Sequence, residues 1–497
     1  MAATSTFSFR AKLILAALLA ALADQLFYGQ AVGWTLGAFD LAVTATVLAV
    51  HPAIRRDPRA ACALGIAASF ALLQVETPSL LSLLLCWTAL AVAALSARVR
   101  SGEAVQRWGA RLVFLAVAGL IGPARDAIHL SGKLAARRRP AASLLPLLVA
   151  PLIGGAGFVA LFALANPVID QALASIPTLW PDALRILFAT FVVTAVWALL
   201  RPRLARLRAR PATVRPAMSG GVFSVAVVCL CLLTFNLIFA LQNALDIAFL
   251  WSGVRLPPGV TYAQYAHRGA YALMATALLA GLFVLVALRP GTPTAAAPWP
   301  RQLVTLWVAQ TLLLVASSML RTLNYVQAYS LTAFRIAALI WMALVGVGLV
   351  LICWRLLRGR SGDWLIGANA LAAAVALALC SGVDLDAVAA GWNVSHAREA
   401  GGDGPPLDLC YLSQLGDAAL VPLSEMERRP LPANLRDRVV WTRGQALAPL
   451  QRRQGDWRGW TWRGQRRLES AENLDPRDLA TTFRGPAYLL CSPARGD

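Results

Sequence analysis

The sequence has almost no lysine, few histidines and none of the motifs that mark the common classes of soluble enzyme. Of its 45 basic residues only Lys12 and Lys133 are lysines, and it has 4 histidines. No G-x-x-x-x-G-K-[ST], H-E-x-x-H, G-x-S-x-G or C-x-x-C segment occurs. These absences exclude a P-loop nucleotidase, a zinc protease and a serine hydrolase built on those motifs. We expect no metal site and no cofactor. Enzyme activity is left open, although the absence of catalytic motifs argues against it.

Long apolar runs recur through the first 384 residues and decide the fold class. The chain is 58% hydrophobic with a mean hydropathy of +0.62. Runs of about 18 or more apolar residues have the length of a helix that crosses a bilayer. The sequence therefore predicts an all-α, polytopic transmembrane bundle over residues 1–384. We expect eleven spans, at 11–28, 31–50, 60–75, 78–97, 144–165, 182–200, 222–250, 268–288, 302–322, 333–356 and 364–384.

The positive charge is concentrated in alternate loops of this bundle. The first 384 residues hold 30 basic and 11 acidic residues, whereas residues 385–497 hold 15 and 14. Lys and Arg accumulate in cytoplasmic loops, so membrane topology explains the net charge of +20 and nucleic acid is not an expected partner. An odd number of spans then predicts a cytoplasmic N-terminus and an extracytoplasmic tail in a bacterial inner membrane. The first helix also resembles a cleavable signal peptide, although we favour an uncleaved span.

One apolar segment does not fit this alternation. Residues 112–123 are apolar but short, have basic loops on both sides and end in Gly-Pro. If they crossed the membrane, one Arg-rich loop would face outward. We therefore interpret them as a re-entrant or interfacial segment, with a twelfth span as the alternative.

The tail, residues 385–497, has a different composition. Residues 397–406 form a Gly/Pro-rich linker, and residues 407–423 predict a short helix that ends near Pro422. Trp460 and Trp462 alternate with polar residues, which is typical of a strand or an interfacial segment. The only tail cysteines, Cys410 and Cys491, would pair in an oxidising compartment or remain two separate thiols. We expect a small extramembrane unit.

Two predicted spans carry polar side chains at membrane depth, where such groups are costly. In 222–250, Asn236, Asn243 and Asp246 are seven and three residues apart and share a helical face, beside Gln242. In the next polar span, five residues also share a face, namely Gln310, Ser317, Arg321, Asn324 and Tyr325. Arg321 would pair with Asp246 across the bundle or extend to water. These groups either hydrogen-bond the helices together or line a polar cleft.

The segment TYAQYAHRGAY, residues 261–271, adds polar groups beside the first of these spans. Its tyrosines, Tyr265 among them, suit the aromatic belt of a membrane interface. His267 and Arg268 begin the next span on the side that otherwise avoids positive charge. The predicted outward polar pocket therefore consists of Asn236, Asn243, Asp246, Tyr265, His267, Arg268, Arg321, Asn324 and Tyr325.

Three segments, 239–291, 317–335 and 392–423, resemble a bacterial multi-pass membrane family. This is domain-of-unknown-function family 4173, which is related to family 4153, and the likeness covers roughly residues 110–465. Ser330 departs from it, because the resemblance implies a Gly in a Tyr-Gly-Leu-Thr run. The resemblance implies a bacterial integral membrane protein and supplies no reaction.

Two functions remain open from the sequence. The first is a binding, assembly or regulatory component of the cell envelope, with the lipid bilayer and, through the tail, other envelope proteins as partners. The alternative is a transporter or lipid-linked membrane enzyme that uses the same polar residues. The inner halves of the polar spans are nearly pure Ala, Leu and Val, which favours the first.

Overall fold

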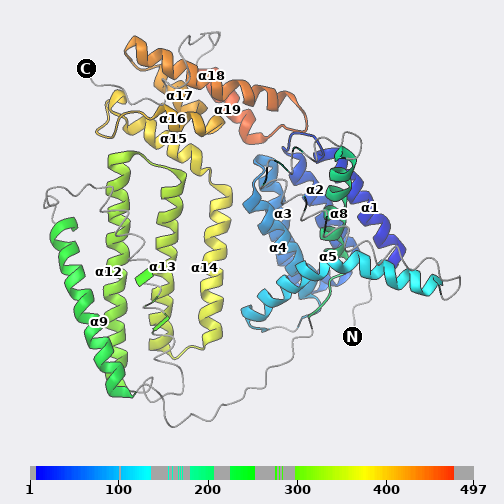
Figure 1. The fold of residues 1–497 in the computed structure, drawn as a ribbon, viewed down its shortest axis with the longest axis horizontal. Coiled ribbons are helices and arrows are strands. Elements are labelled where there is room, and N and C mark those ends of the chain that lie inside the picture. The colour runs from blue at the N-terminus through cyan, green and yellow to red at the C-terminus, as the bar shows by residue number, and fades with distance from the viewer. Residues whose placement is uncertain are drawn as a thin grey trace. The chain divides into compact units, whose positions relative to one another are not determined.

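The described residues of the computed structural model are helical, and they contain no strand (Figure 1). They comprise 7–99, 102–135, 180–205, 224–251 and 297–474, with a few isolated positions at 155–171 and 275–283. The chain divides into two compact units. Unit 1 is Met1–Arg208 with Gln451–Arg466, and unit 2 is Ala209–Leu450 with Arg467–Asp497. A helical membrane bundle, as the apolar runs predict, is the fold class of this protein.

Nine of the eleven expected spans coincide with described helices, and 144–165 and 268–288 lie largely outside the described residues. Within the described part, seven helices are long and apolar enough to cross a membrane. Two more apolar helices are shorter. The helices that match expected spans are α1 (Phe9–Phe27), α2 (Thr35–Val50), α3 (Pro58–Glu76), α4 (Leu80–Ser96), α8 (Trp180–Leu200), α9 (Val225–Asp246), α12 (Pro298–Tyr329), α13 (Ala333–Arg358) and α14 (Gly362–Gly382).

Small side chains allow the helices of unit 1 to pack closely. Four buried alanines recur every three or four residues on α3, namely Ala60, Ala63, Ala67 and Ala71. Such a row of small residues lets two membrane helices approach each other, and the thiol of Cys86 on α4 lies 3.3 Å from the Ala67 carbonyl oxygen. On α2, a Cβ added to Gly37 would lie 2.4 Å from the Ala71 carbonyl oxygen. The α2–α3–α4 core therefore depends on small residues at its contacts.

The segment 112–123 forms the middle of a continuous helix, α5 (Val105–Ala135). By length and composition its first part, Val105–Asp126, is among the seven candidate spans. Near its middle, Gly119 approaches Ala198 in the last turn of α8, and Arg203, just beyond the end of α8, donates to the Gly122 carbonyl over 3.4 Å. Figure 1 draws α5 across α8 and not alongside it. These contacts lie at the end of α8 that is followed by Arg201 and Arg203.

A segment of the tail contacts the opposite ends of the unit 1 helices. We call residues 456–466 the tail clip. The Trp34 amide donates to the Trp460 carbonyl over 2.8 Å, and the Trp34 indole donates to the Trp457 carbonyl over 2.7 Å. Arg463 and Arg466 both pair with Glu76 at the end of α3. The clip is therefore attached to the α1–α2 and α3–α4 connections.

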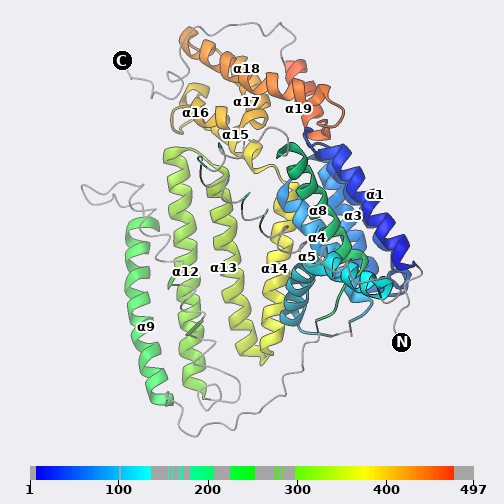
Figure 2. The same ribbon diagram turned by 45° about the vertical axis from the view of Figure 1, so that its right-hand side comes forward.

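In unit 2, the four helices α9, α12, α13 and α14 lie side by side (Figures 1 and 2). One end of α12 to α14 is covered by the tail helices α15 (Leu385–His396), α16 (Leu409–Gln414) and α17 (Leu420–Glu427). The other tail helices are α18 (Ala433–Gly455) and α19 (Trp462–Leu474). The tail also contains two short 3-10 helices, η4 (Arg398–Ala400) and η5 (Gly416–Ala419). A third short 3-10 helix, η1 (Pro52–Arg56), lies between α2 and α3.

The tail helices pack on one another through two apolar cores. One core joins α15, α16, α17 and α18 through fully buried residues that include Leu412, Leu423 and Met426. A second core joins Leu420 and Leu450 to Leu468 of α19. Arg467 of α19 also pairs with Asp384 and, at 3.1 Å, with Asp417. The apolar area that these cores bury stabilises the packing of the tail helices.

Three details of the tail differ from the sequence predictions. The predicted helix over 407–423 is interrupted at Leu415 and continues past Pro422 to Glu427. The strand considered around Trp460 is wrong, because Trp462 begins α19 and the described residues form no strand. Residues 397–406 form a compact turn in which Arg398 donates to the Gly404 carbonyl over 3.0 Å.

Candidate functional site

The polar residues of α9 lie against α12. Asn236, Asn243 and Asp246 are all buried, which confirms that their seven- and three-residue spacing places them on one packed face. Both helices run in the same direction, since residues early in α9 contact residues early in α12 and later residues contact later ones. We call this row of facing polar groups the α9–α12 seam.

Hydrogen bonds cross the seam at two levels. The Gln310 side-chain amide donates to Asn236 Oδ1 over 2.7 Å, and the Asn236 amide donates to the Leu303 carbonyl over 3.0 Å. The Asn243 amide donates to the Gln310 main-chain carbonyl over 3.2 Å. Hydrogen bonds between membrane helices contribute about 0.6–2 kcal/mol each, so these contacts hold the two helices in register.

The third level is the ion pair between Asp246 and Arg321, which confirms the expected pairing. Arg321 Nη2 donates to Asp246 Oδ1, and Gln242 Nε2 donates to the same oxygen over 2.9 Å. The side chains are 1% and 5% exposed, so both charges are removed from solvent. A buried charge requires a partner of opposite sign, because an isolated ion in an apolar medium is very costly. Arg321 therefore pairs with Asp246 and does not extend to water.

The seam keeps unused hydrogen-bonding capacity. Within the described residues, Asp246 Oδ2, Asn243 Oδ1 and Gln310 Oε1 are buried oxygens without a hydrogen-bond partner. Buried polar atoms are nearly always satisfied by protein, water or ligand. The seam can therefore accept hydrogen bonds from a small donor-bearing molecule such as water or an amine.

An unusual helix turn adjoins the ion pair. The chain leaves α9 through a π-helical turn, η3 (Ile247–Trp251), and π turns occur mostly as local insertions at functional sites. The Trp251 indole donates to Ser317 Oγ over 3.1 Å, while half of the Trp251 side chain is exposed. This turn adds another contact to the seam beyond Asp246.

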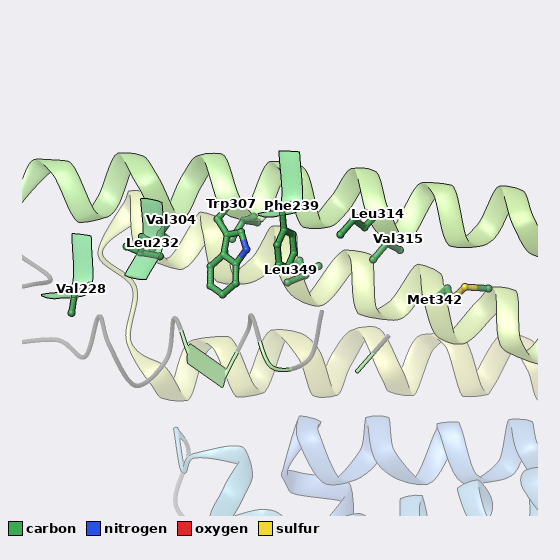
Figure 3. Packing of buried hydrophobic residues seen from close by; sticks show 10 residues of the cluster. Val228, Leu232, Phe239, Val304, Trp307, Leu314, Val315, Met342 and Leu349 are labelled. Atoms are coloured by element: carbon green, nitrogen blue, oxygen red, sulfur yellow. The ribbon is translucent and has the colours of Figure 1, made fainter. Parts of the chain in front are cut away.

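Apolar packing accompanies the polar contacts along α9 and α12. Figure 3 shows Val228, Leu232, Val304, Trp307 and Phe239 as members of one buried apolar cluster. The Trp307 ring lies 5.2–5.7 Å from the rings of Phe235, Phe239 and Phe283. An open apolar groove of about 480 Å³ adjoins these rings. The Asn236–Leu303 contact lies beside these residues, so polar and apolar contacts are interspersed along the described part of the interface.

Five of the nine predicted site residues lie outside the seam or outside the described residues. Tyr325 packs on Tyr329, with ring centroids 4.8 Å apart, and under the guanidinium of Arg335. Asn324 beside it is half-buried. Tyr265, His267 and Arg268 lie outside the described residues. The structure thus brings together Asn236, Asn243, Asp246 and Arg321 of the predicted set, and it adds Gln310, Ser317 and Trp251.

The turn between α12 and α13 is held by tail residues. Asn393 of α15 exchanges two hydrogen bonds with the main chain of Leu331, at 2.6 and 2.8 Å. The Ala333 amide donates to the Tyr411 hydroxyl over 3.1 Å. Ser330, within this turn, has φ 71° and ψ 163°, a backbone conformation adopted almost only by glycine. The turn therefore stores strain at the residue where the family resemblance implies glycine.

Replacing Ser330 by glycine is expected to stabilise the protein by about 1–3 kcal/mol, because glycine adopts this conformation without a Cβ clash. The measurement is the thermal midpoint of the detergent-purified full-length protein. Ser330→Ala is the matched control, since it removes the hydroxyl and keeps the Cβ. A gain with alanine equal to that with glycine would contradict the strain argument.

Sequence analysis overlooked the basic cluster at the end of α8. There Lys12 donates to the Leu200 carbonyl over 3.2 Å, and Arg98 donates to the Pro202 carbonyl over 2.8 Å. His51 Nε2 lies 3.0 Å from the Leu199 carbonyl oxygen, and His51 is buried. Cations near a helix C-terminus interact favourably with its unpaired carbonyls. These contacts come from α1, α4 and the α2–η1 connection, so no local sequence pattern indicates them.

Acidification is expected to destabilise unit 1 through His51. Burial lowers the pKa of His51 from 6.5 to about 4. The positive charges of Arg98 and Lys12 also lower this pKa, whereas the hydrogen bond to the Leu199 carbonyl raises it. Between these two values the unfolded chain binds more protons than the folded one, so stability falls as pH falls, by at most about 3 kcal/mol. Thermal midpoints between pH 7 and pH 4 test this, and His51→Gln should flatten the response. An unchanged acid response in His51→Gln would refute the assignment.

A second overlooked residue is Asp40, a fully buried carboxyl within α2. The signal was available, because a carboxylate inside an apolar run is as unusual as Asp246. Its partners, Gln74 and Trp87, lie 34 and 47 residues away. They could not be identified from spacing.

Comparison with known proteins gives a family for this arrangement. The model of a domain of unknown function, DUF4153, matches residues 60–426, which is well over half of the chain. The chain belongs to the DUF4153 family. The resemblance to family 4173 is thereby corrected to its related family 4153. No curated protein and no solved structure matched. The DUF4153 match includes the seam and the Ser330 turn, and it ends before the tail clip.

Proposed function

We propose that this DUF4153 protein is a binding or assembly component of the bacterial cell envelope. Its recognition surface would be formed by exposed side chains of the tail, Trp457 among them. The observation that carries this proposal is the closure of the seam. Its polar groups pair with one another across α9 and α12, and a buried apolar cluster around Trp307 packs beside them. A transporter requires polar groups that continue along the membrane.

The folded tail supports a binding role as well. Asn393 and Tyr411 attach the tail directly to the α12–α13 turn, so the tail is positioned and not suspended on a linker. Trp457 remains about half exposed on the clip, with Arg458 stacked 4.6 Å above its ring. Exposed Trp and Arg side chains are typical centres of protein recognition. The tail thus offers anchoring groups to a partner.

We also propose an inner-membrane topology with a cytoplasmic N-terminus and an extracytoplasmic tail. The basic cluster of Lys12, Arg98 and His51 lies at the end of α2 opposite to the clip, in accord with the positive-inside rule. Cys410 takes part in a disulfide, while six other described cysteines are free thiols, and disulfides persist in oxidising compartments. Cys491, the partner considered from the sequence, lies outside the described residues.

This topology treats α5 as an interfacial helix, so that eleven helices cross the membrane. Fusions of alkaline phosphatase or green fluorescent protein after Asp497 test it. Phosphatase activity without fluorescence is the expected result. Fluorescence without phosphatase activity would make α5 a spanning helix and place the tail in the cytoplasm.

The binding role is tested by photo-crosslinking in native membranes. A crosslinking residue replaces Trp457 on the clip or, as the control, Trp354 near the basic end of α13; both tryptophans are about half exposed. We expect a discrete envelope component to be captured at position 457 and not at 354. The proposal fails if purified protein in liposomes takes up a solute and the double replacement Asp246→Asn with Arg321→Gln, which isolates no charge, abolishes that uptake. That result would establish the transporter alternative.

A further inference from the structure

Buried carboxyl groups of this protein differ in whether a cation faces them. Among the described residues, three Asp or Glu side chains are buried, namely Asp40, Asp126 and Asp246. Asp126 meets Arg201 and Arg203, each at 2.8 Å, and Asp246 meets Arg321. Asp40 forms no ion pair with any described residue. It is also the most buried of the three, with no exposed surface.

The groups around Asp40 are all neutral. Trp87 Nε1 of α4 donates to Asp40 Oδ1 over 3.0 Å, and Gln74 Nε2 of α3 donates to Oδ2 over 2.9 Å. The thiol of Cys86 also contacts the carboxyl. Charged groups on the neighbouring elements are engaged elsewhere: Asp24 of α1 pairs with Arg185, and Glu76 of α3 pairs with Arg463 and Arg466.

One acceptor atom of the cluster is left without a donor. Gln74 is fully buried, and its Oε1 has no hydrogen-bond partner among the described residues. Asp40 lies about 7.5 Å along α2 from its first residue, at 1.5 Å per residue, within an apolar bundle. An ionised carboxylate without a cation is strongly disfavoured there, and such a group neutralises instead. A single added proton corrects both the charge and the shortage of donors.

We propose that Asp40 binds a proton in the folded protein, so that Asp40, Gln74, Trp87 and Cys86 form a neutral proton-binding site among α2, α3 and α4. The step is the addition of one proton to the carboxylate, with no bond broken and nothing oxidised or reduced. The site is separate from the seam and from the recognition surface of the proposed function. It gives unit 1 a buried acid that exchanges one proton.

Infrared spectroscopy of the full-length protein in liposomes at neutral pH tests this proposal. We expect the carbonyl band of a protonated carboxylic acid, shifted when aspartate is labelled with carbon-13, and lost in Asp40→Asn. The double replacement Asp246→Asn with Arg321→Gln is the matched control, because it removes an equally buried but ion-paired carboxyl without isolating a charge, and the band should persist in it. Absence of an aspartic acid band from the labelled wild-type protein would overturn the proposal, as would loss of the band in the control variant but not in Asp40→Asn. If Asp40→Asn fails to fold, absence of the band from the wild-type protein still refutes the proposal.

Discussion

Replacing Arg321 by alanine is expected to destabilise the protein by about 3–5 kcal/mol, which is enough to prevent its accumulation in the membrane. The substitution leaves Asp246, 1% exposed, as an uncompensated charge on the packed face of α9. Asp246→Ala should have a similar effect, because it isolates the Arg321 guanidinium instead. Thermal unfolding and the yield of monodisperse detergent-solubilised protein measure both variants.

Two further variants separate the pairing from a general loss of packing. The double replacement Asp246→Asn with Arg321→Gln removes both charges, so it should recover most of the stability lost in either single variant. The charge swap, Asp246→Arg with Arg321→Asp, should recover part of it. Arg185→Ala provides the contrast, because Arg185 pairs with Asp24 but is 52% exposed, and such pairs contribute about 0–1 kcal/mol. If neither double variant is more stable than the single variants, loss of the ion pair is not the cause of the destabilisation.

Replacing Gly33 by alanine is expected to detach the tail clip. A Cβ at this position would lie 2.4 Å from the Trp460 carbonyl oxygen and 2.5 Å from the Arg458 carbonyl oxygen. Both atoms belong to the main chain, so no side-chain rotation relieves the overlap, and the clip must move away. Breaking the two Trp34 hydrogen bonds, at about 1 kcal/mol each, should raise the opened population at least tenfold. Trypsin cleavage after the arginines of the clip reports this opening.

Gly65→Ala is the matched control for the clip. Gly65 lies on α3, and an added Cβ would meet no atom within 4 Å. Alanine also favours helix over glycine, so this variant should keep or slightly raise the thermal midpoint and leave trypsin sensitivity unchanged. Equal trypsin sensitivity in Gly33→Ala and the wild-type protein would show that the clip tolerates the added methyl group.

The sequence predicted the features that follow from the length of apolar runs and from the spacing of residues along a helix. Runs of span length leave a helix as the favourable structure in lipid, which is why nine expected spans coincide with helices. The seven- and three-residue spacing of Asn236, Asn243 and Asp246 placed them on one face, and depth alone suggested Arg321 as the partner. The wrong interpretation at Trp460 and Trp462 arose because an alternation of only three residues does not establish a period.

The remaining features depend on contacts between distant parts of the chain. Asp40 was visible as a carboxylate within a span, but its lack of a cation is a property of the folded α2–α4 core. The attachment of the clip to Gly33 and Trp34 uses main-chain carbonyls, which no pattern of side chains reveals. The strain at Ser330 depends on the backbone geometry of the turn. The only indication of it in the sequence was the family resemblance, which implies glycine at this position.

The contacts of the clip with Trp34 and Thr35 are made by main-chain carbonyls of the clip, so they do not depend on which side chains the clip carries at those positions. Trp34 and Thr35 bind the carbonyl oxygens of Trp457, Arg458 and Trp460, and these oxygens exist whatever side chains those residues carry. The side chains at positions 457, 458 and 460 can therefore diversify among relatives, or be exchanged for an epitope, while Arg463 and Arg466 keep their ion pairs with Glu76 and the loop stays docked. The clip is thus a natural grafting position, where a new binding specificity can be installed without redesigning the bundle beneath it.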